Sequence, residues 1–142
     1  MPIERIIVGV DGSAGASKAL ELTAELADAC GAEVVAVHAF EPLALVGKIE
    51  PPLDFVKIKH DTEALLRDEW CRPLADAGVD YRTTVVEDDP VGALIDTAKA
   101  QDGDLIVVGT RGVGGVRGLM VGSVANKLPH KSHVPVTIVP PD

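Results

Sequence analysis

The feature that most restricts the fold of this chain is the stretch from Asp104 to Ser123, where an apolar segment, a glycine-rich loop and a helix start follow one another. Leu105 to Val108 is continuously apolar and rich in β-branched residues, which is typical of a parallel strand buried on both faces. The loop after it has glycines at positions 109, 112, 114, 115 and 118, and a helix is predicted from Ser123 to Leu128. Because glycine lacks a Cβ and a helix start offers unpaired N–H groups, this arrangement predicts an anion-binding site.

The charges around this loop favour the same interpretation. The segment between Leu105 and Pro141 contains no Asp or Glu, although the whole chain has a formal net charge of -9. Its Lys and Arg residues are Arg111, Arg117, Lys127 and Lys131. A cationic stretch within an acidic chain indicates a local anion site rather than a surface for polyanions. The phosphate groups of a small molecule are therefore the expected ligand.

Three phosphate-binding patterns can be compared with this loop. The Walker pattern is absent, since Ile49 follows the Gly-Lys pair at positions 47 and 48. The dinucleotide pattern fails because Arg117 stands where its third glycine is required, and because the loop follows a late strand. A third pattern, Gly-x2-Gly-x9-Gly-Ser/Thr, fits residues 109 to 123 without a gap. In this motif the sequence resembles the universal stress protein family, in its ATP-binding branch, and the resemblance covers essentially the whole chain.

Composition limits the class of protein further. The chain of 142 residues is long enough for one buried α/β domain, and its 46% hydrophobic but only 3% aromatic content predicts a core of aliphatic side chains. No apolar run approaches the length of a membrane span, and the N-terminus has no signal-peptide pattern, so a cytoplasmic protein is expected. Cys30 and Cys71 lack metal or redox spacing and are expected to be reduced. The acidic composition argues against nucleic-acid binding.

The apolar pattern alternates between strand and helix along the chain. Strands are predicted at Ile3 to Val10, Glu33 to Ala39, Asp80 to Val86, Leu105 to Val108 and Pro135 to Val139. Helices are predicted from the N-cap Ser13 to the stop at Gly31, from about Leu53 to Ala77 with a bend near Pro73, and from Pro90 to Ala100 behind an acidic cap. The proline-containing segment from Phe40 to Asp61 is predicted to be a loop or lid.

Strands separated by helices predict a parallel sheet with right-handed crossovers and helices on both faces. The resemblance implies more: a single universal stress protein domain over residues 1 to 142, with an α/β, doubly wound, five-stranded parallel sheet in the order 3-2-1-4-5. This is a Rossmann-like fold of the adenine nucleotide alpha hydrolase-like type. In that order the first and fourth strands are neighbours where the winding reverses, so we expect Asp11 and Gly109 at one site.

The resemblance also implies a site for ATP and Mg²⁺. Its residues are Val10, Asp11, Ala39, Gly109, Thr110, Arg111, Gly112, Gly122, Ser123 and Val124. Val10 and Ala39 fall where the family forms its adenine pocket, and Asp11 is placed to bond a ribose hydroxyl or to help hold a metal ion. Each role has a structural alternative: Asp11 as a turn cap, the glycines as a tight turn, Ser123 as an N-cap, and the arginines as solvated loop residues.

No set of residues in the sequence indicates a catalytic centre. His38 is predicted to be a packed, hydrogen-bonded core residue, while His60, His130 and His133 show no nucleophile spacing. A nucleotide-binding regulatory module of the stress response is therefore the first hypothesis. Slow ATP hydrolysis or phosphotransfer, and a dimeric interaction protein with an empty loop, are the alternatives.

The C-terminal segment bears on oligomeric state. Val134 to Val139 is a short apolar strand, and in the implied order it lies at a sheet edge, where an uncovered edge favours pairing with another chain. In the family this strand pairs with its copy. A homodimer is therefore expected.

Overall fold

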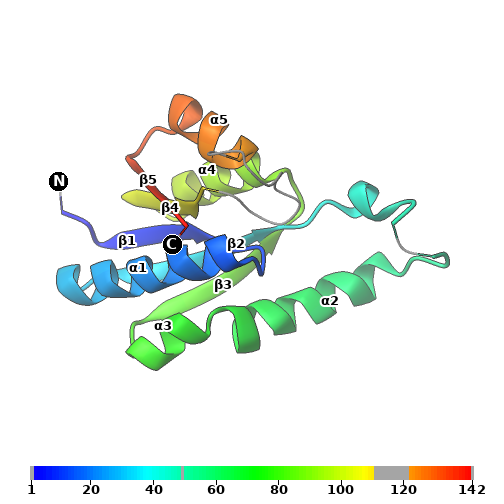
Figure 1. The fold of residues 1–142 in the computed structure, drawn as a ribbon, viewed down its shortest axis with the longest axis horizontal. Coiled ribbons are helices and arrows are strands. Elements are labelled where there is room, and N and C mark those ends of the chain that lie inside the picture. The colour runs from blue at the N-terminus through cyan, green and yellow to red at the C-terminus, as the bar shows by residue number, and fades with distance from the viewer. Residues whose placement is uncertain (1, 49, 111–121, 142) are drawn as a thin grey trace.

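The computed structural model describes residues 2–48, 50–110 and 122–141. Its centre is a five-stranded parallel sheet in the order β3-β2-β1-β4-β5, which confirms the implied topology (Figure 1). The strands are β1 (Arg5–Gly9), β2 (Glu33–Ala39), β3 (Tyr81–Val86), β4 (Leu105–Gly109) and β5 (Val136–Val139). The sheet places β1 directly beside β4, with Ile6 opposite Leu105 and Val8 opposite Val107.

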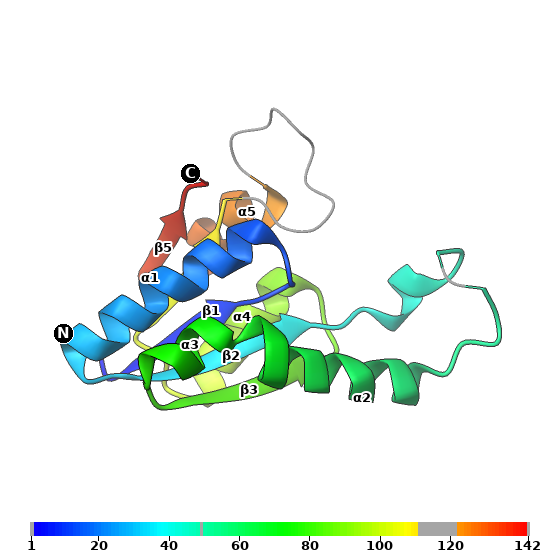
Figure 2. The same cartoon turned by 60° about the horizontal axis from the view of Figure 1, so that its bottom comes forward.

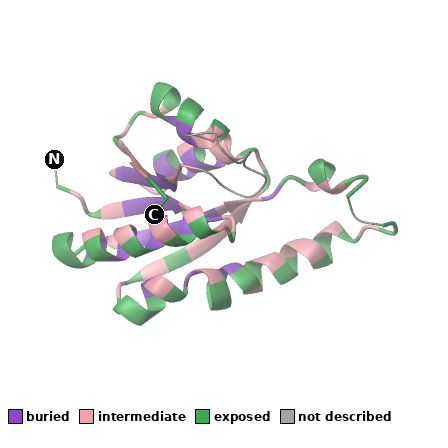
Figure 3. Ribbon diagram, viewed as in Figure 1, coloured by how far each residue is buried: buried purple, intermediate pink, exposed green. Residues whose placement is uncertain are grey.

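The strands are buried on both faces because alternate residues enter two separate cores. On one face Ile6, Val8 and Val107 pack with side chains of α1 (Ala14–Cys30) and α3 (Arg72–Ala77). On the other face Ile7 and Ile106 pack with side chains of α4 (Pro90–Ala100) and α5 (Ser123–Lys131). Figure 3 shows the buried residues concentrated in the sheet and on the helix sides that cover it. The continuous apolar runs in the sequence follow from this two-sided burial.

The helix boundaries that depend on local capping agree with the sequence. The side chain of Ser13 accepts a hydrogen bond from the Ala16 N–H at the start of α1, and Gly31 ends that helix in the left-handed conformation. Asp89 caps α4 by accepting from the Gly92 N–H. In these cases the capping group lies within one helical turn of its partner, so the sequence alone contains the required information.

The segment between β2 and β3 is more structured than expected. A short 3₁₀ helix, η1 (Pro42–Leu45), lies within the predicted loop, and α2 (Phe55–Leu65) begins close to the predicted helix start at about Leu53. The helix widens into a π-helical turn, η2 (Leu66–Trp70), and is interrupted at Cys71, close to the predicted bend near Pro73. α3 starts afterwards with this proline in its first turn, where no N–H is needed. Figure 2 shows η1 and the first half of α2 extending beyond the sheet.

Two further differences concern the ends of elements. β1 is shorter than the predicted Ile3 to Val10. α5 continues through Pro129 to Lys131, beyond the predicted end at Leu128. Pro129 has no N–H to donate, but the last turn is retained because the Ser132 N–H donates to the Leu128 carbonyl at 2.9 Å. Among the described residues, no helix is both long and apolar enough to cross a membrane.

Candidate functional site

The site begins where β1 and β4 end side by side, at the carboxyl edge of the sheet. Gly109, the last residue of β4, lies against the first turn of α1: a Cβ at this position would be 2.7 Å from the Gly15 carbonyl oxygen. Thr110, the next residue, accepts a hydrogen bond from the Gly122 N–H, which directly precedes α5. Two successive residues therefore connect the end of β4 to the starts of two helices. The expected meeting of the Asp11 and Gly109 segments is confirmed.

The turn between β1 and α1 is held by its own side chains. Asp11 Oδ1 accepts hydrogen bonds from the Ser13 N–H at 3.0 Å and the Ser13 hydroxyl at 2.5 Å. Gly12 between them has a φ of 79°, a conformation that residues with a Cβ rarely adopt. The structural alternative for Asp11, capping of this turn, is thus present in the structure. It is compatible with a ligand role because a carboxylate accepts several hydrogen bonds.

The end of β2 contacts this turn through His38. Its Nδ1 lies 2.8 Å from the Val10 carbonyl oxygen, and because a carbonyl only accepts, Nδ1 carries the proton. The prediction that His38 is hydrogen-bonded and packed is confirmed, although the residue is half-buried. Val10 itself is 4% exposed and donates its N–H to the Val37 carbonyl. Ala39, the last residue of β2, is half-buried beside these groups.

Trp70 completes this side of the site and was missed as a site residue. Its ring meets that of His38 edge to face, with centroids 5.2 Å apart. It also lies against Gly12, where a Cβ would be 2.8 Å from Cε2 and Cζ2 of the indole. The sequence indicates only an apolar position on a helix, and nothing in its spacing relates Trp70 to a turn so distant along the chain.

The other side of the site is the start of α5. Gly122 is its N-cap, in an extended conformation and without a side-chain hydrogen bond to the helix, so the predicted alternative of Ser123 as N-cap is wrong. Ser123 is instead the first helical residue, and it is exposed. The first N–H groups of a helix have no partner inside it, and the N-cap Gly122 has no side chain that could accept from them. Val124 follows in the same first turn.

Thr110, another predicted ligand residue, makes its hydrogen bonds to β5. Both its N–H and its hydroxyl donate to the Val139 carbonyl, at 3.0 and 3.1 Å. Its side chain therefore attaches the loop to β5. Arg111 and Gly112, two further predicted ligand residues, lie outside the described residues.

Asp11 is the one residue predicted as a metal ligand. Within residues 2–48, 50–110 and 122–141, no group of three or more His, Cys, Asp or Glu side chains could hold a metal ion. Mg²⁺ prefers oxygen ligands and commonly combines one or two carboxylates with phosphate oxygens. Asp11 fits that pattern only if a phosphate-bearing ligand supplies further oxygens.

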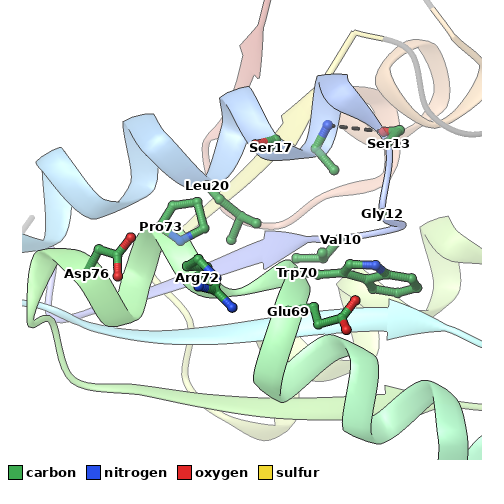
Figure 4. A pocket seen from close by; sticks show the side chains of 11 residues that line it. Val10, Gly12, Ser13, Ser17, Leu20, Glu69, Trp70, Arg72, Pro73 and Asp76 are labelled. Carbon is green, nitrogen blue, oxygen red and sulfur yellow. Dashed lines mark hydrogen bonds between the residues drawn. The ribbon is translucent and has the colours of Figure 1, made fainter.

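A pocket of about 350 Å³ lies beside the turn, between α1 and the η2–α3 segment (Figure 4). Its apolar wall includes Val10, Leu20 and Trp70, and its polar groups include those of Ser13 and Arg72. Figure 4 shows the indole close to the turn at Val10 and Gly12. The pocket therefore adjoins the Asp11 turn on the face of the sheet that α1 and α3 cover.

The strand order, with its reversal between β1 and β4 and two helix starts at that point, defines a doubly wound α/β protein. In sheets of this class, ligands bind at the carboxyl edge, where the winding reverses. Comparison with known sequences identifies the family. A family model described as the universal stress protein family matches residues 2–140. The chain belongs to the universal stress protein family.

Curated relatives agree. A universal stress protein of Mycobacterium tuberculosis is 33% identical over 136 residues, which are 94% of this chain but 44% of the relative. The chain thus spans less than half the length of this relative. Universal stress protein YxiE of Bacillus subtilis is 30% identical, with 95% of this chain and 97% of the relative covered.

Solved structures show the same fold. One, described as the complex of a universal stress protein with cAMP, has a TM-score of 0.75 and 26% identity and covers 100% of both chains. Another, a universal stress protein of Archaeoglobus fulgidus in complex with dAMP, has a TM-score of 0.68 and 25% identity, with 98% of this chain and 99% of that chain covered.

Proposed function

We propose that this protein is a single-domain regulatory module that binds an adenine nucleotide, with ATP and Mg²⁺ as its ligands, at the carboxyl ends of β1 and β4. The observation that carries the proposal is the convergence of the Asp11 turn and the start of α5, where glycine is the N-cap, linked through Gly109 and Thr110. The complexes of relatives with cAMP and dAMP support the ligand class.

The residues present fit such a ligand. The start of α5 offers backbone N–H groups and the positive end of a helix dipole, and no carboxylate occurs from Leu105 to Pro141 to repel phosphate. We assign Gly122, Ser123 and Val124 to the phosphates, with Arg111 and Gly112 in the same loop. Asp11 takes the ribose hydroxyl or the magnesium ion, and the bound ion neutralises phosphate charge.

The base is assigned to the opposite end of the site. Val10 directly follows β1, and Ala39 ends the neighbouring β2. Their small apolar side chains are suited to the face of an adenine ring. The site thus separates an apolar end from an end rich in N–H donors. An adenosine phosphate has the same division between base and phosphate.

Gly122→Asp provides a sharp test. Gly122 has a φ of -75° and a ψ of 171°, which any residue adopts, and Asp is a preferred N-cap, so the variant should retain its stability. Its carboxylate would occupy the phosphate position and repel the ligand. Ala29→Asp is the matched control: it adds the same charge at an exposed helical position near the C-terminal end of α1, away from the carboxyl edge of the sheet.

We expect calorimetry to show heat of binding with Mg²⁺ and ATP for the parent and for Ala29→Asp, and a loss of at least about tenfold in affinity for Gly122→Asp. Titrations with ADP, AMP and cAMP rank the nucleotides. The proposal is wrong if the parent gives no heat at millimolar nucleotide and carries none from the cell. Equal affinity of the parent and Gly122→Asp would refute the assigned phosphate position.

The exposed edge of β5 supports a proposal about assembly. β5 pairs with β4 on one side, and among the described strands none lies on its other side. A short apolar edge strand favours pairing with a second copy. We therefore propose a homodimer through Val134 to Val139, and a monomer mass by light scattering at micromolar concentration would contradict it.

A further inference from the structure

The π-helical turn between α2 and α3 has a specific consequence for the position of Trp70. The Cys71 N–H donates to the Leu66 carbonyl at 3.1 Å, a bond that spans one more residue than in an α-helix. Leu66, Cys71 and Leu74 around this turn are 0% exposed and form the core contacts of the segment. Trp70 is only partly buried, and its ring extends from that core to the carboxyl edge of the sheet.

At that edge the indole supports the Asp11 turn directly. Gly12 can lie against the ring because it has no side chain: a Cβ there would be 2.8 Å from two indole carbons. Gly12 also has the positive φ that the turn requires. The backbone between Val10 and Ser13 thus rests on Trp70, while Asp11 closes the turn through Ser13.

The same indole reaches the end of β2 through a second contact. It packs edge to face on His38, whose Nδ1–H donates to the Val10 carbonyl oxygen at 2.8 Å. Trp70 therefore contacts Gly12 from one side and the hydrogen-bond partner of Val10 from another. These two contacts fix the backbone that presents Val10 and Asp11.

The surroundings of the ring distinguish it from an ordinary core residue. Trp70 lines the pocket of about 350 Å³, so one side of the indole adjoins open space rather than packed side chains. A shift of the turn can move the ring toward this space without compressing the core. The ring is also the single tryptophan of the chain.

From these contacts we propose that Trp70 is the positioning residue of the nucleotide site: its indole holds the turn of Val10 to Ser13 in the binding geometry and passes changes in that turn to the η2–α3 segment. This inference rests on the proposed function. It adds the element through which occupancy of the site reaches the helices between β2 and β3. Trp70 makes no contact with the nucleotide in this scheme and acts through Gly12 and His38.

The experiment compares Trp70→Ala and Trp70→Phe with a control in the same core. Tyr81 packs against the same hydrophobic cluster as Trp70, but it is the first residue of β3, at the amino end of the sheet. Tyr81→Ala therefore removes an aromatic ring from this core without touching the site. Affinity for ATP with Mg²⁺ is measured by calorimetry well below the melting temperature of each variant, and the tryptophan emission of the parent is recorded during the same titration.

We expect ATP to change the emission of the parent, and Trp70→Ala to weaken binding about tenfold, the size of effect seen for residues that couple to a site without touching the ligand. Trp70→Phe, which retains an aromatic ring, should recover most of the affinity, and Tyr81→Ala should bind as the parent does. If Trp70→Ala fails to fold, Trp70→Leu replaces it in the comparison.

The outcomes separate this inference from the proposed function. If the parent binds no nucleotide, the proposed function fails and the inference fails with it. If the parent binds ATP with unchanged emission, and Trp70→Ala or Trp70→Leu binds as tightly as Tyr81→Ala, then Trp70 is a packing residue only. In that case the positioning role is refuted while nucleotide binding stands.

Discussion

Gly109→Ala tests whether the first glycine of the motif serves the fold as well as the ligand. A Cβ at this position would lie 2.7 Å from the carbonyl oxygen and 2.8 Å from the carbonyl carbon of Gly15. Ordinary contacts of a Cβ begin near 3.4 Å, so the two backbones would have to separate by roughly 0.7 Å. Neither partner is a side chain that can rotate away.

The cost follows from how firmly both backbones are held. Gly109 is paired with Val139 in the sheet, and Gly15 lies in the first turn of a capped helix. Forcing one extra carbon into such a contact costs about 1–3 kcal/mol, and the lower entropy of alanine in the unfolded chain returns about 0.4–1 kcal/mol. We expect a net loss of about 1.3 kcal/mol. For a chain of 142 residues that lowers the melting temperature by roughly 4 °C.

The assay is thermal unfolding without nucleotide, with Gly92→Ala as the control. A Cβ at Gly92 would meet the Asp88 carboxylate at 2.5 Å, but that side chain can turn away, and alanine favours the helix by up to about 1 kcal/mol. The control should therefore melt within about 2 °C of the parent. If Gly109→Ala also melts like the parent, the glycine is not required by the contact with Gly15, and the reasoning is refuted.

Three further predictions concern the described residues. Burial raises the pKa of Cys71 to about 12, so at pH 8 only about one Cys71 thiol in ten thousand is ionised. A thiol reagent should therefore label the exposed Cys30 alone until the protein unfolds. Labelling of both thiols in the folded protein would contradict this. Hydrogen bonding from the first turn of α4 lowers the pKa of Asp89. The ionised carboxylate therefore stabilises the fold above the ordinary Asp pKa, and this stabilisation is lost as the pH falls through the lowered value. Asp89→Ala should cost about 1 kcal/mol in urea unfolding at pH 7, and the difference from the parent should shrink below about pH 4. Ser13→Ala removes the N-cap of α1 and should lower the free energy of unfolding by about 1 kcal/mol. Ser17→Ala, at an exposed position of the same helix, should leave it almost unchanged. Equal losses in the two variants would argue against the cap.

The amino-acid sequence by itself determined the elements and their ends. The continuous apolar runs predicted a parallel sheet with helices on both faces. The helix caps at Ser13, Gly31 and Asp89 depend on hydrogen-bond partners within a few residues. The family motif supplied the strand order, and with it the meeting of Asp11 and Gly109. These features are predictable because their physical causes are local, or because one spacing pattern carries them.

Only the tertiary structure decided how the edge of the sheet is built. The packing of Trp70 on Gly12, and of Gly109 on Gly15, joins segments far apart in the chain, so it depends on how each crossover helix lies over the sheet. The π-helical widening that begins at Leu66 also depends on burial against that sheet, and the sequence predicted only a bend near Pro73. A proline or a helix cap affects residues close to it in the sequence. The contacts of the Trp70 indole are made with residues far away in the sequence, so they follow only from the tertiary structure.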